Sequence, residues 1–133
     1  MGIKILSSRD FIIKLENGDQ IPIILERFRA PILFEEIIRS IPIRSRLFLS
    51  RDQMFVYIPL GLKKKIGIGG RDLSIKKGDV GFMVINQSLI IGLKDGNIAY
   101  PFLLIGKVKN LSSLKVLEGI QSSINVEINI HEA

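Results

Sequence analysis

The stretch FIIKLENGDQIPIILE, residues 11–26, decides how this chain begins to fold. Two apolar runs, residues 11–15 and 20–26, flank the segment Glu16-Asn17-Gly18-Asp19. Asn-Gly is a preferred pair for the two left-handed residues of a type I′ turn, so the stretch predicts a β-hairpin closed by that turn. Pro22 lacks a backbone N–H, and we therefore expect the second strand to lie at a sheet edge.

Working outward from this hairpin, the chain continues as short apolar runs separated by turns. The runs that we predict to be strands are residues 43–49, 53–58, 80–85, 89–93, 102–108 and 124–131. The last run alternates Ile or Val with polar residues from Ile124 to His131, which is typical of a strand with one buried face.

Two segments have helical features instead. In residues 31–41, Pro31 suits the first helical position, Phe34 and Ile37 follow at helical spacing, and Pro42 ends the pattern. Residues 110–119 begin with Asn110, a good N-cap, and end with Gly119, a good C-cap. The sequence thus predicts two short helices.

Together these elements predict a mainly β fold. Eight or nine strands at close spacing with two short helices indicate a closed β-barrel, because closure hides the edges of Ile-rich strands. A chain of 133 residues is about one domain long, so we expect a single domain over residues 1–133.

Composition excludes several classes of function. The absence of cysteine excludes disulfides, thiolate metal sites and thiol nucleophiles. No run approaches the roughly 20 apolar residues of a membrane span, and the first residues lack a secretion signal, so we expect a cytoplasmic protein. The abundance of isoleucine and lysine hints at a thermophilic, archaeal-type source. The net charge of +6 makes this a basic protein and favours anionic partners.

Several segments in a fixed order resemble the small cyclophilin-like barrel family of bacterial and archaeal proteins, most of which have no assigned function. The resemblance spans roughly residues 20 to 130. Its segments are Ile41-Pro42-Ile43, Ser50-Arg51, Phe55-Val56-Tyr57-Ile58-Pro59, Lys77-Gly78-Asp79-Val80-Gly81-Phe82, Leu104-Ile105-Gly106-Lys107-Val108 and the Leu-rich residues 111–117.

This resemblance implies a cyclophilin-like barrel and raises the question of prolyl isomerase activity. Cyclophilins that catalyse this reaction carry an arginine in a Phe-His-Arg segment, which is absent here. The family also usually carries a Trp near the Ser-Arg turn and a Gly-Pro-Thr-Pro-like loop. This chain has no Trp, and Lys94-Asp95-Gly96-Asn97 stands where that loop would be. We therefore expect a non-catalytic barrel that binds a peptide or small ligand and lacks isomerase activity.

Other catalytic chemistry finds little support in the sequence. The single histidine, His131, lies near the C-terminus on the polar side of the last strand, so a catalytic triad or a histidine metal site is not expected. Glu35 and Glu36 are adjacent on a helix and diverge. The run Gly67-Ile68-Gly69-Gly70 matches no phosphate-binding pattern and predicts a flexible basic loop. We expect no metal and no cofactor.

The most informative surface is predicted around Arg51. Pairing Phe48 with Gln53 would place the apolar residues of both strands in the core, with Arg46 across from Phe55 and Arg44 across from Tyr57. The candidate ligand-binding residues on this predicted face are Arg44, Arg46, Phe48, Arg51, Gln53, Phe55 and Tyr57.

Three functions fit this face. A peptide or small ligand could lie along the barrel wall, or single-stranded nucleic acid could stack on the aromatic residues and pair with Lys63, Lys64, Lys65 and Arg71. A structural subunit of a homo-oligomer is the third possibility. Alternatively, a helix covers the aromatic side chains while the arginines extend outward, in which case the face binds nothing.

Overall fold

The computed structural model describes residues 8–67, 70–120 and 122–131. Nine strands and four helical segments make up this part of the chain. The strands are β1 (Ser8–Leu15), β2 (Gln20–Glu26), β3 (Ile43–Leu49), β4 (Phe55–Pro59), β5 (Asp72–Ile75), β6 (Asp79–Met83), β7 (Ser88–Gly92), β8 (Gly96–Val108) and β9 (Ser123–Ile130). The α-helix is α1 (Pro31–Ser40), and the 3₁₀ segments are η2 (Arg27–Arg29), η3 (Val84–Asn86) and η4 (Leu111–Leu117).

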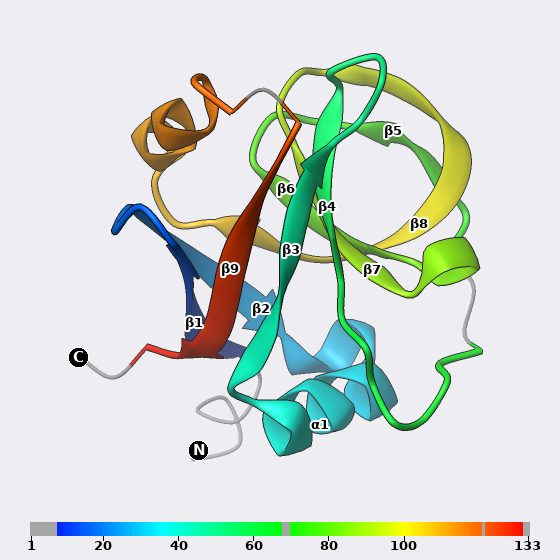
Figure 1. Ribbon diagram of the computed structural model, residues 1–133. Helices are drawn as coiled ribbons and strands as arrows, with labels where there is room; N and C mark the ends of the chain where they lie inside the picture. The colour runs from blue at the N-terminus through cyan, green and yellow to red at the C-terminus, as the bar shows by residue number, and fades with distance from the viewer. Residues whose placement is uncertain (1–7, 68–69, 121, 132–133) are drawn as a thin grey trace.

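Eight of the strands close into an antiparallel barrel in the order β2-β1-β9-β3-β4-β7-β6-β8, and β2 pairs with β8 to complete the circle (Figure 1). The ninth strand, β5, pairs with β8 outside this circle. The predicted closed barrel is therefore confirmed. Strand β5 was not predicted, because its sequence DLSI has three exposed residues and no long apolar run.

The first hairpin forms as predicted, but two of its details differ. Leu15 and Asp19 are joined by a backbone hydrogen bond of 2.8 Å, which leaves a three-residue loop in which Gly18 alone is left-handed. Such a loop is a type I turn with a bulge rather than a type I′ turn. The edge position expected for Pro22 is also wrong, since residues 23–25 of β2 pair with β8 and Lys109 N–H donates to the Pro22 carbonyl.

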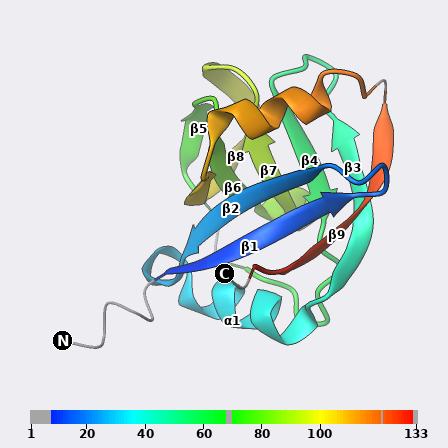
Figure 2. The same cartoon turned by 90° about the vertical axis from the view of Figure 1, so that its left-hand side faces the viewer.

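The two ends of the barrel are covered differently. Helix α1 lies across the lower end in Figure 1, where Leu33, Phe34 and Ile37 are buried against the core. The segment η4 lies beside the opposite end, and Figure 2 shows it passing above β2 and β6. Asn110 caps η4 as predicted, but the segment is a 3₁₀ helix that ends at Leu117, before Gly119. Among the described residues, no helix has the length and apolar character to cross a membrane.

Two separate hydrophobic clusters stabilise the fold. The larger fills the barrel and includes the inward residues of the predicted alternating strand β9, Val126 and Ile128. The smaller lies outside the barrel wall, where β5 and the first half of β8 fold over β4, β7 and β6. Its buried members are Ile75, Met83, Ile90, Ile98 and Phe102. Strand β7 lies between the two clusters, which is why all five of its residues are buried.

Strands β3 and β4 pair in a register that differs from the predicted one. Phe48 lies opposite Tyr57, and Leu49 opposite Val56. The shift from the predicted register is four residues, and because side chains alternate with period two, the same residues still face outward. The outward side of Arg44, Arg46, Phe48, Phe55 and Tyr57 was thus predicted correctly. The pairs Arg46–Phe55 and Arg44–Tyr57 were wrong, and so was the strand position of residues 53–54, which belong to the turn, where Met54 packs against the outer cluster.

Candidate ligand-binding cavity

A cavity of about 500 Å³ opens at the end of the barrel that η4 only partly covers. Its lining comes from the end of β3, the β3–β4 turn, the turn before β6, the β7–β8 turn and η4. The lining residues are Leu49, Gln53, Lys77, Leu93, Lys94, Leu111, Ser112, Leu114, Lys115, Leu117, Glu118 and Ile120. A volume of this size lies within the range of ordinary small-molecule sites.

The position of η4 keeps this end of the barrel open. Asn110 Oδ1 accepts a hydrogen bond from Ser112 N at 3.2 Å, and this cap sets where the 3₁₀ segment begins. Leu114 and Leu117 are buried and anchor one side of η4 to the core. The helix therefore lines one wall of the cavity and does not fill it.

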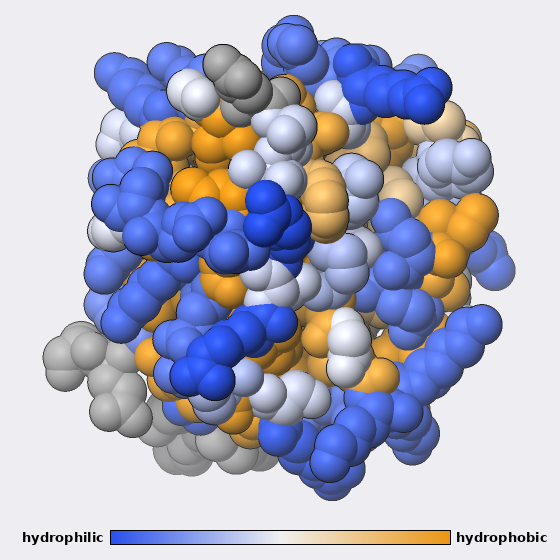
Figure 3. Space-filling view, viewed as in Figure 1, coloured by the Kyte–Doolittle hydropathy of each residue, from blue (hydrophilic) through white to orange (hydrophobic). Residues whose placement is uncertain are grey.

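The walls of the cavity are mainly apolar. Half of the lining residues are leucine or isoleucine. One of them, Leu111, is 52% exposed at the rim. In Figure 3, apolar surface bordered by hydrophilic residues is visible at the upper left, where η4 faces β9. The cavity can thus bury the apolar part of a ligand away from water.

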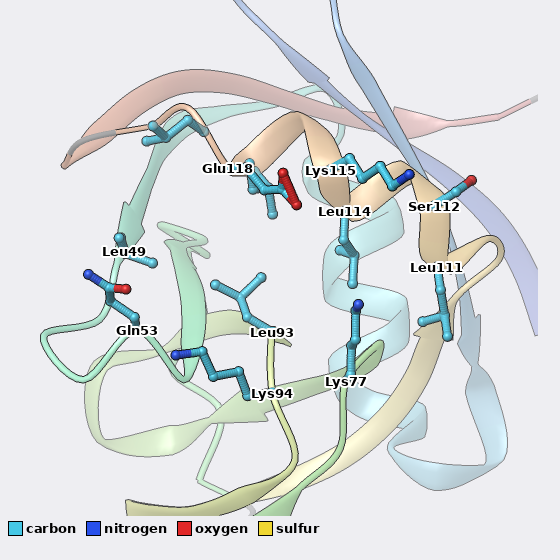
Figure 4. Close-up of a pocket in the computed structure, with 12 residues that line it drawn as sticks. Leu49, Gln53, Lys77, Leu93, Lys94, Leu111, Ser112, Leu114, Lys115 and Glu118 are labelled. Carbon is cyan, nitrogen blue, oxygen red and sulfur yellow. The ribbon is translucent and has the colours of Figure 1, made fainter.

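Charged side chains surround the opening. Lys77, Lys94 and Lys115 come from three different segments, and Glu118 is the single carboxylate of the lining. In Figure 4, the amine of Lys77 points toward Leu114, and the carboxylate of Glu118 points toward the middle of the opening. Lys94 extends toward Gln53, and Lys115 toward Ser112. Of the ion pairs formed within the described ranges, none includes any of these four residues.

Hydrogen bonds fix the turns that carry two of the lysines. Lys77 N–H donates to Asp95 Oδ1 at 2.8 Å, so the β7–β8 turn is tied directly to the turn before β6. Lys76 N–H donates to Asp79 Oδ2 at 2.9 Å. Both aspartates therefore accept hydrogen bonds from backbone N–H groups, as Asp in turns commonly does. The backbone at Lys77 is held in place while its side chain is left to face the cavity.

The β3–β4 turn at the cavity rim is organised by Ser50 and Asp52. Ser50 Oγ donates to Asp52 Oδ1 at 2.7 Å, and this hydrogen bond lowers the pKa of the Asp52 carboxyl below its usual value. The Met54 N–H and the nearby charge of Lys94 act in the same direction on that pKa. Gln53, which lines the cavity, has a left-handed φ of 59° in this turn.

The arginines of the predicted binding face contact β9 rather than the aromatic residues of β4. Arg44 Nε lies 3.1 Å from Glu127 Oε2. Arg46 donates from Nε to Ser123 Oγ at 2.9 Å and from Nη1 to Asn125 Oδ1 at 2.6 Å. Among the described residues, the only arginine placed over an aromatic ring is Arg29, over Phe28.

The aromatic residues of that face are half-buried. The Phe48 and Tyr57 rings stack with centroids 5.2 Å apart, and the Phe55 ring lies 6.2 Å from that of Tyr57. Phe55 and Tyr57 also pack against the outer cluster. The cover therefore comes from β5 and β8, not from the helix considered in the sequence analysis.

The remaining predicted site residues are dispersed. Arg51 is exposed in the β3–β4 turn, and Arg71 is exposed just before β5. The three lysines of residues 63–65 are exposed in the segment that follows β4. Of the predicted ligand-binding residues, only Gln53 lines the cavity. Within the glycine-rich loop 67–70, Ile68 and Gly69 lie outside the described residues.

Titratable groups elsewhere form ordinary structural contacts. Glu35 pairs with Arg27 at 3.2 Å, and Glu36 with Arg39 at 3.5 Å. His131 is exposed, and its N–H donates to the Asp10 carbonyl. In the part of the chain that the structure describes, no three acidic or histidine side chains converge as a metal site would require.

Sequence reasoning missed the three lysines of the cavity. Each belongs to a turn or helix that was recognised separately, namely Lys76-Lys77-Gly78-Asp79, Lys94-Asp95-Gly96-Asn97 and residues 110–119. Only the barrel topology brings these segments to one end of the molecule. Had strand direction been assigned, the position of both turns at the same end of an antiparallel barrel would have indicated the site.

Comparison with known proteins supports the fold. The hypothetical protein AF2241 from Archaeoglobus fulgidus is similar in structure, with a TM-score of 0.73 and 18% identity, over 94% of this chain and 96% of that one. McbB, solved in complex with tryptophan, has a TM-score of 0.69 and 18% identity, and the match covers 92% of this chain but only 45% of McbB. No protein-family model and no curated protein matches the sequence.

Proposed function

We propose that this chain is a binding barrel that holds a small organic ligand in the cavity beside η4. The observation that carries the proposal is the cavity itself, about 500 Å³ lined by leucines and an isoleucine with a few charged groups at its rim. Sites for small molecules in proteins are typically concave, largely apolar and equipped with a small number of polar groups.

This cavity is a better candidate than the outer face for two reasons. On the outer face, Arg44 and Arg46 already bond Glu127, Ser123 and Asn125, so a ligand would have to displace these partners. In the cavity, the exposed rim residue Leu111 would lose its contact with water when a ligand binds. Peptide or nucleic-acid binding on the outer face and membership of the cyclophilin-like family remain predictions.

One neighbour is relevant to the size of the ligand. McbB has the same fold over this region and was solved in complex with tryptophan. Its likeness to this chain is one of fold, at 18% identity, and its tryptophan supports only the general idea that such a barrel can be part of a protein that holds a small amphipathic molecule.

Amide NMR spectra recorded during a titration with 3-ethylindole, a small neutral apolar probe, test the proposal. We expect shifts that concentrate on residues 49, 53, 93–94 and 111–120. A Leu93→Trp variant places a larger side chain in the cavity and should abolish these shifts. The matched control is Ile85→Trp, at a position that is 68% exposed on η3 and does not line the cavity.

Two results would contradict the proposal. Shifts concentrated on residues 44, 46, 48, 55 and 57, with none at 93–94 and 111–120, would move the site to the outer face. Equal binding by the Leu93→Trp and Ile85→Trp variants would show that the probe does not enter the cavity.

A further inference from the structure

We infer that the ligand of this cavity is an amphipathic monoanion, a molecule with an apolar body and one carboxylate-like group. The inference rests on the proposed function and adds the chemical class of the ligand. It follows from the distribution of charged side chains around the opening. An entirely apolar ligand would not need these charges.

The first step is the sign of the charge at the rim. Lys77, Lys94 and Lys115 outnumber Glu118, the one acidic residue of the lining. Asp52 and Asp95 lie nearby, but Asp95 Oδ1 accepts a backbone hydrogen bond and Asp52 Oδ1 accepts one from Ser50. Asp95 thereby joins the β7–β8 turn to the turn before β6, whereas Asp52 bonds within the β3–β4 turn. Neither carboxylate belongs to the lining, so the lining itself has three positive charges and one negative charge.

The second step is that none of the three lysines forms an ion pair within the described residues, although the charge of Lys94 acts on the Asp52 carboxyl. The ion pairs within the described residues involve Arg27, Arg29, Arg39, Arg44 and Lys109, and none of the cavity lysines. A lysine without a carboxylate partner can bind an anionic group of a ligand without breaking an existing ion pair. The three lysines come from three segments around one opening. In Figure 4, the Lys77 amine points inward, and the Lys94 and Lys115 amines, which extend toward Gln53 and Ser112, would have to change rotamer to reach an anionic group beside it.

The third step is the number of charges on the ligand. Glu118 points toward the middle of the opening in Figure 4, so its carboxylate would repel any negative charge placed there. An anionic group therefore has to lie beside the lysines, and a second anionic group nearer to Glu118 is disfavoured. The leucines below the rim require that the rest of the ligand be apolar. A single carboxylate at the level of the lysines, with an apolar body below it, satisfies both conditions.

A series of indoles that differ only in charge tests this inference. The probes are indole-3-propionate, 3-ethylindole and tryptamine, which are anionic, neutral and cationic at neutral pH. Because the chain has no Trp, the indole fluorescence of each probe can be followed without a protein signal of the same kind. We expect the dissociation constant of the propionate to be about fivefold lower than that of 3-ethylindole, since each contact with an exposed lysine contributes modestly. Tryptamine should bind most weakly.

Variants assign the effect to the lysines. The double variant Lys77→Met/Lys115→Met keeps most of both side-chain stems and should remove most of the preference for the propionate over 3-ethylindole, leaving the part that Lys94 contributes. The matched control is Lys64→Met/Lys65→Met, which removes the same charge from the segment after β4 and should leave the fivefold preference intact. In Glu118→Gln, the propionate should bind about twofold more tightly, because a repulsive charge is removed. High salt should reduce the preference for the propionate.

The outcomes separate the two proposals. Equal binding of the propionate and 3-ethylindole by the unmodified protein overturns the inference, but leaves the binding function standing. Tightest binding by tryptamine overturns it as well and makes Glu118 the dominant rim charge. A preference for the propionate that persists undiminished in Lys77→Met/Lys115→Met also contradicts it. If no member of the series binds, the proposed function itself fails.

Discussion

At the residue scale, Ser50 has the largest structural role in the rim of the cavity. Its hydroxyl donates to Asp52 Oδ1 and accepts from the N–H groups of Met54 and Phe55, at 3.1 and 3.2 Å. One side chain thus satisfies several groups of a turn that contains no glycine. The left-handed φ of Gln53 persists because these hydrogen bonds hold the turn on both sides of it.

Replacing Ser50 should therefore change both the stability and the acid–base behaviour of the turn. In Ser50→Ala, we expect the pKa of Asp52 to rise toward its usual value, measured by NMR titration of the carboxyl group. We also expect a loss of about 1 kcal/mol in the free energy of unfolding at neutral pH. Because the folded-state pKa of Asp52 is lowered, its ionised form stabilises the fold at neutral pH, and this part is lost as pH falls through that pKa.

The difference in stability between Ser50→Ala and the unmodified protein should accordingly narrow in acid. Ser74→Ala is the matched control, since Ser74 is exposed in β5 and none of the side-chain hydrogen bonds within the described ranges involves it. An Asp52 pKa that stays the same in Ser50→Ala would show that the hydroxyl is not responsible for the shift.

This turn also shows where sequence reasoning ends at the residue scale. The Ser50-Arg51 turn was predicted, and so was the outward face of the strands beside it. The register of the two strands was not predicted. Gln rarely adopts a left-handed conformation, so Gln53 did not indicate a turn, and no Asn or Gly marked the longer loop. Alternation alone determines which face a residue occupies, and it leaves shifts by an even number of residues open.

At the element scale, closure of the barrel depends on the contact of β2 with β8. This ladder is short, since it joins only residues 23–25 to residues 106–108. It is also close, because a Cβ atom at Gly106 would overlap with the carbonyl oxygen of Ile24. Gly106 is therefore needed because it has no Cβ atom, which lets the two backbones approach closely. Its φ is not left-handed, so backbone conformation is not the reason for a glycine here.

Gly106→Ala should open or strain this ladder. We expect the free energy of unfolding to fall by about 1–3 kcal/mol, as for other overpacked core positions, with faster amide hydrogen exchange in β2 and β8. Gly119→Ala is a suitable control, because a Cβ there meets no atom within 4 Å and the glycine has no left-handed φ. Equal stability of the two variants would contradict the role given to Gly106 in closure.

The elements themselves were largely predictable. Helix α1 and strands β3 and β9 follow from periodicity and from proline at the helix boundaries. Strand β5 and the first half of β8 were missed because they fold over the outside of the barrel, where burial does not follow simple alternation. Those two segments also cover Phe55 and Tyr57, which is why the predicted aromatic face is only half-exposed.

At the scale of the whole molecule, the two ends of the barrel differ in a way that suggests their roles. Helix α1 fills one end with buried side chains, and the small cavity of about 10 Å³ beneath it has no space for a ligand. The other end keeps a cavity of about 500 Å³. The site could not be predicted from the sequence, since its charged residues are separated along the chain and meet only when the barrel closes.

The net charge of +6 fits binding of anions in general, so the salt dependence of binding is informative. Single-stranded nucleic acid that neutralises four phosphates would show a slope of log affinity against log salt of about −3. A monoanion held in the cavity should show a much shallower dependence, because it displaces few counterions.

The most direct test of the account is a crystal structure of the protein with indole-3-propionate. The account predicts the indole among Leu49, Leu93 and Leu114, with its carboxylate at the level of the cavity lysines. Indole density on the outer face beside Phe55 and Tyr57, with the cavity empty, would contradict it.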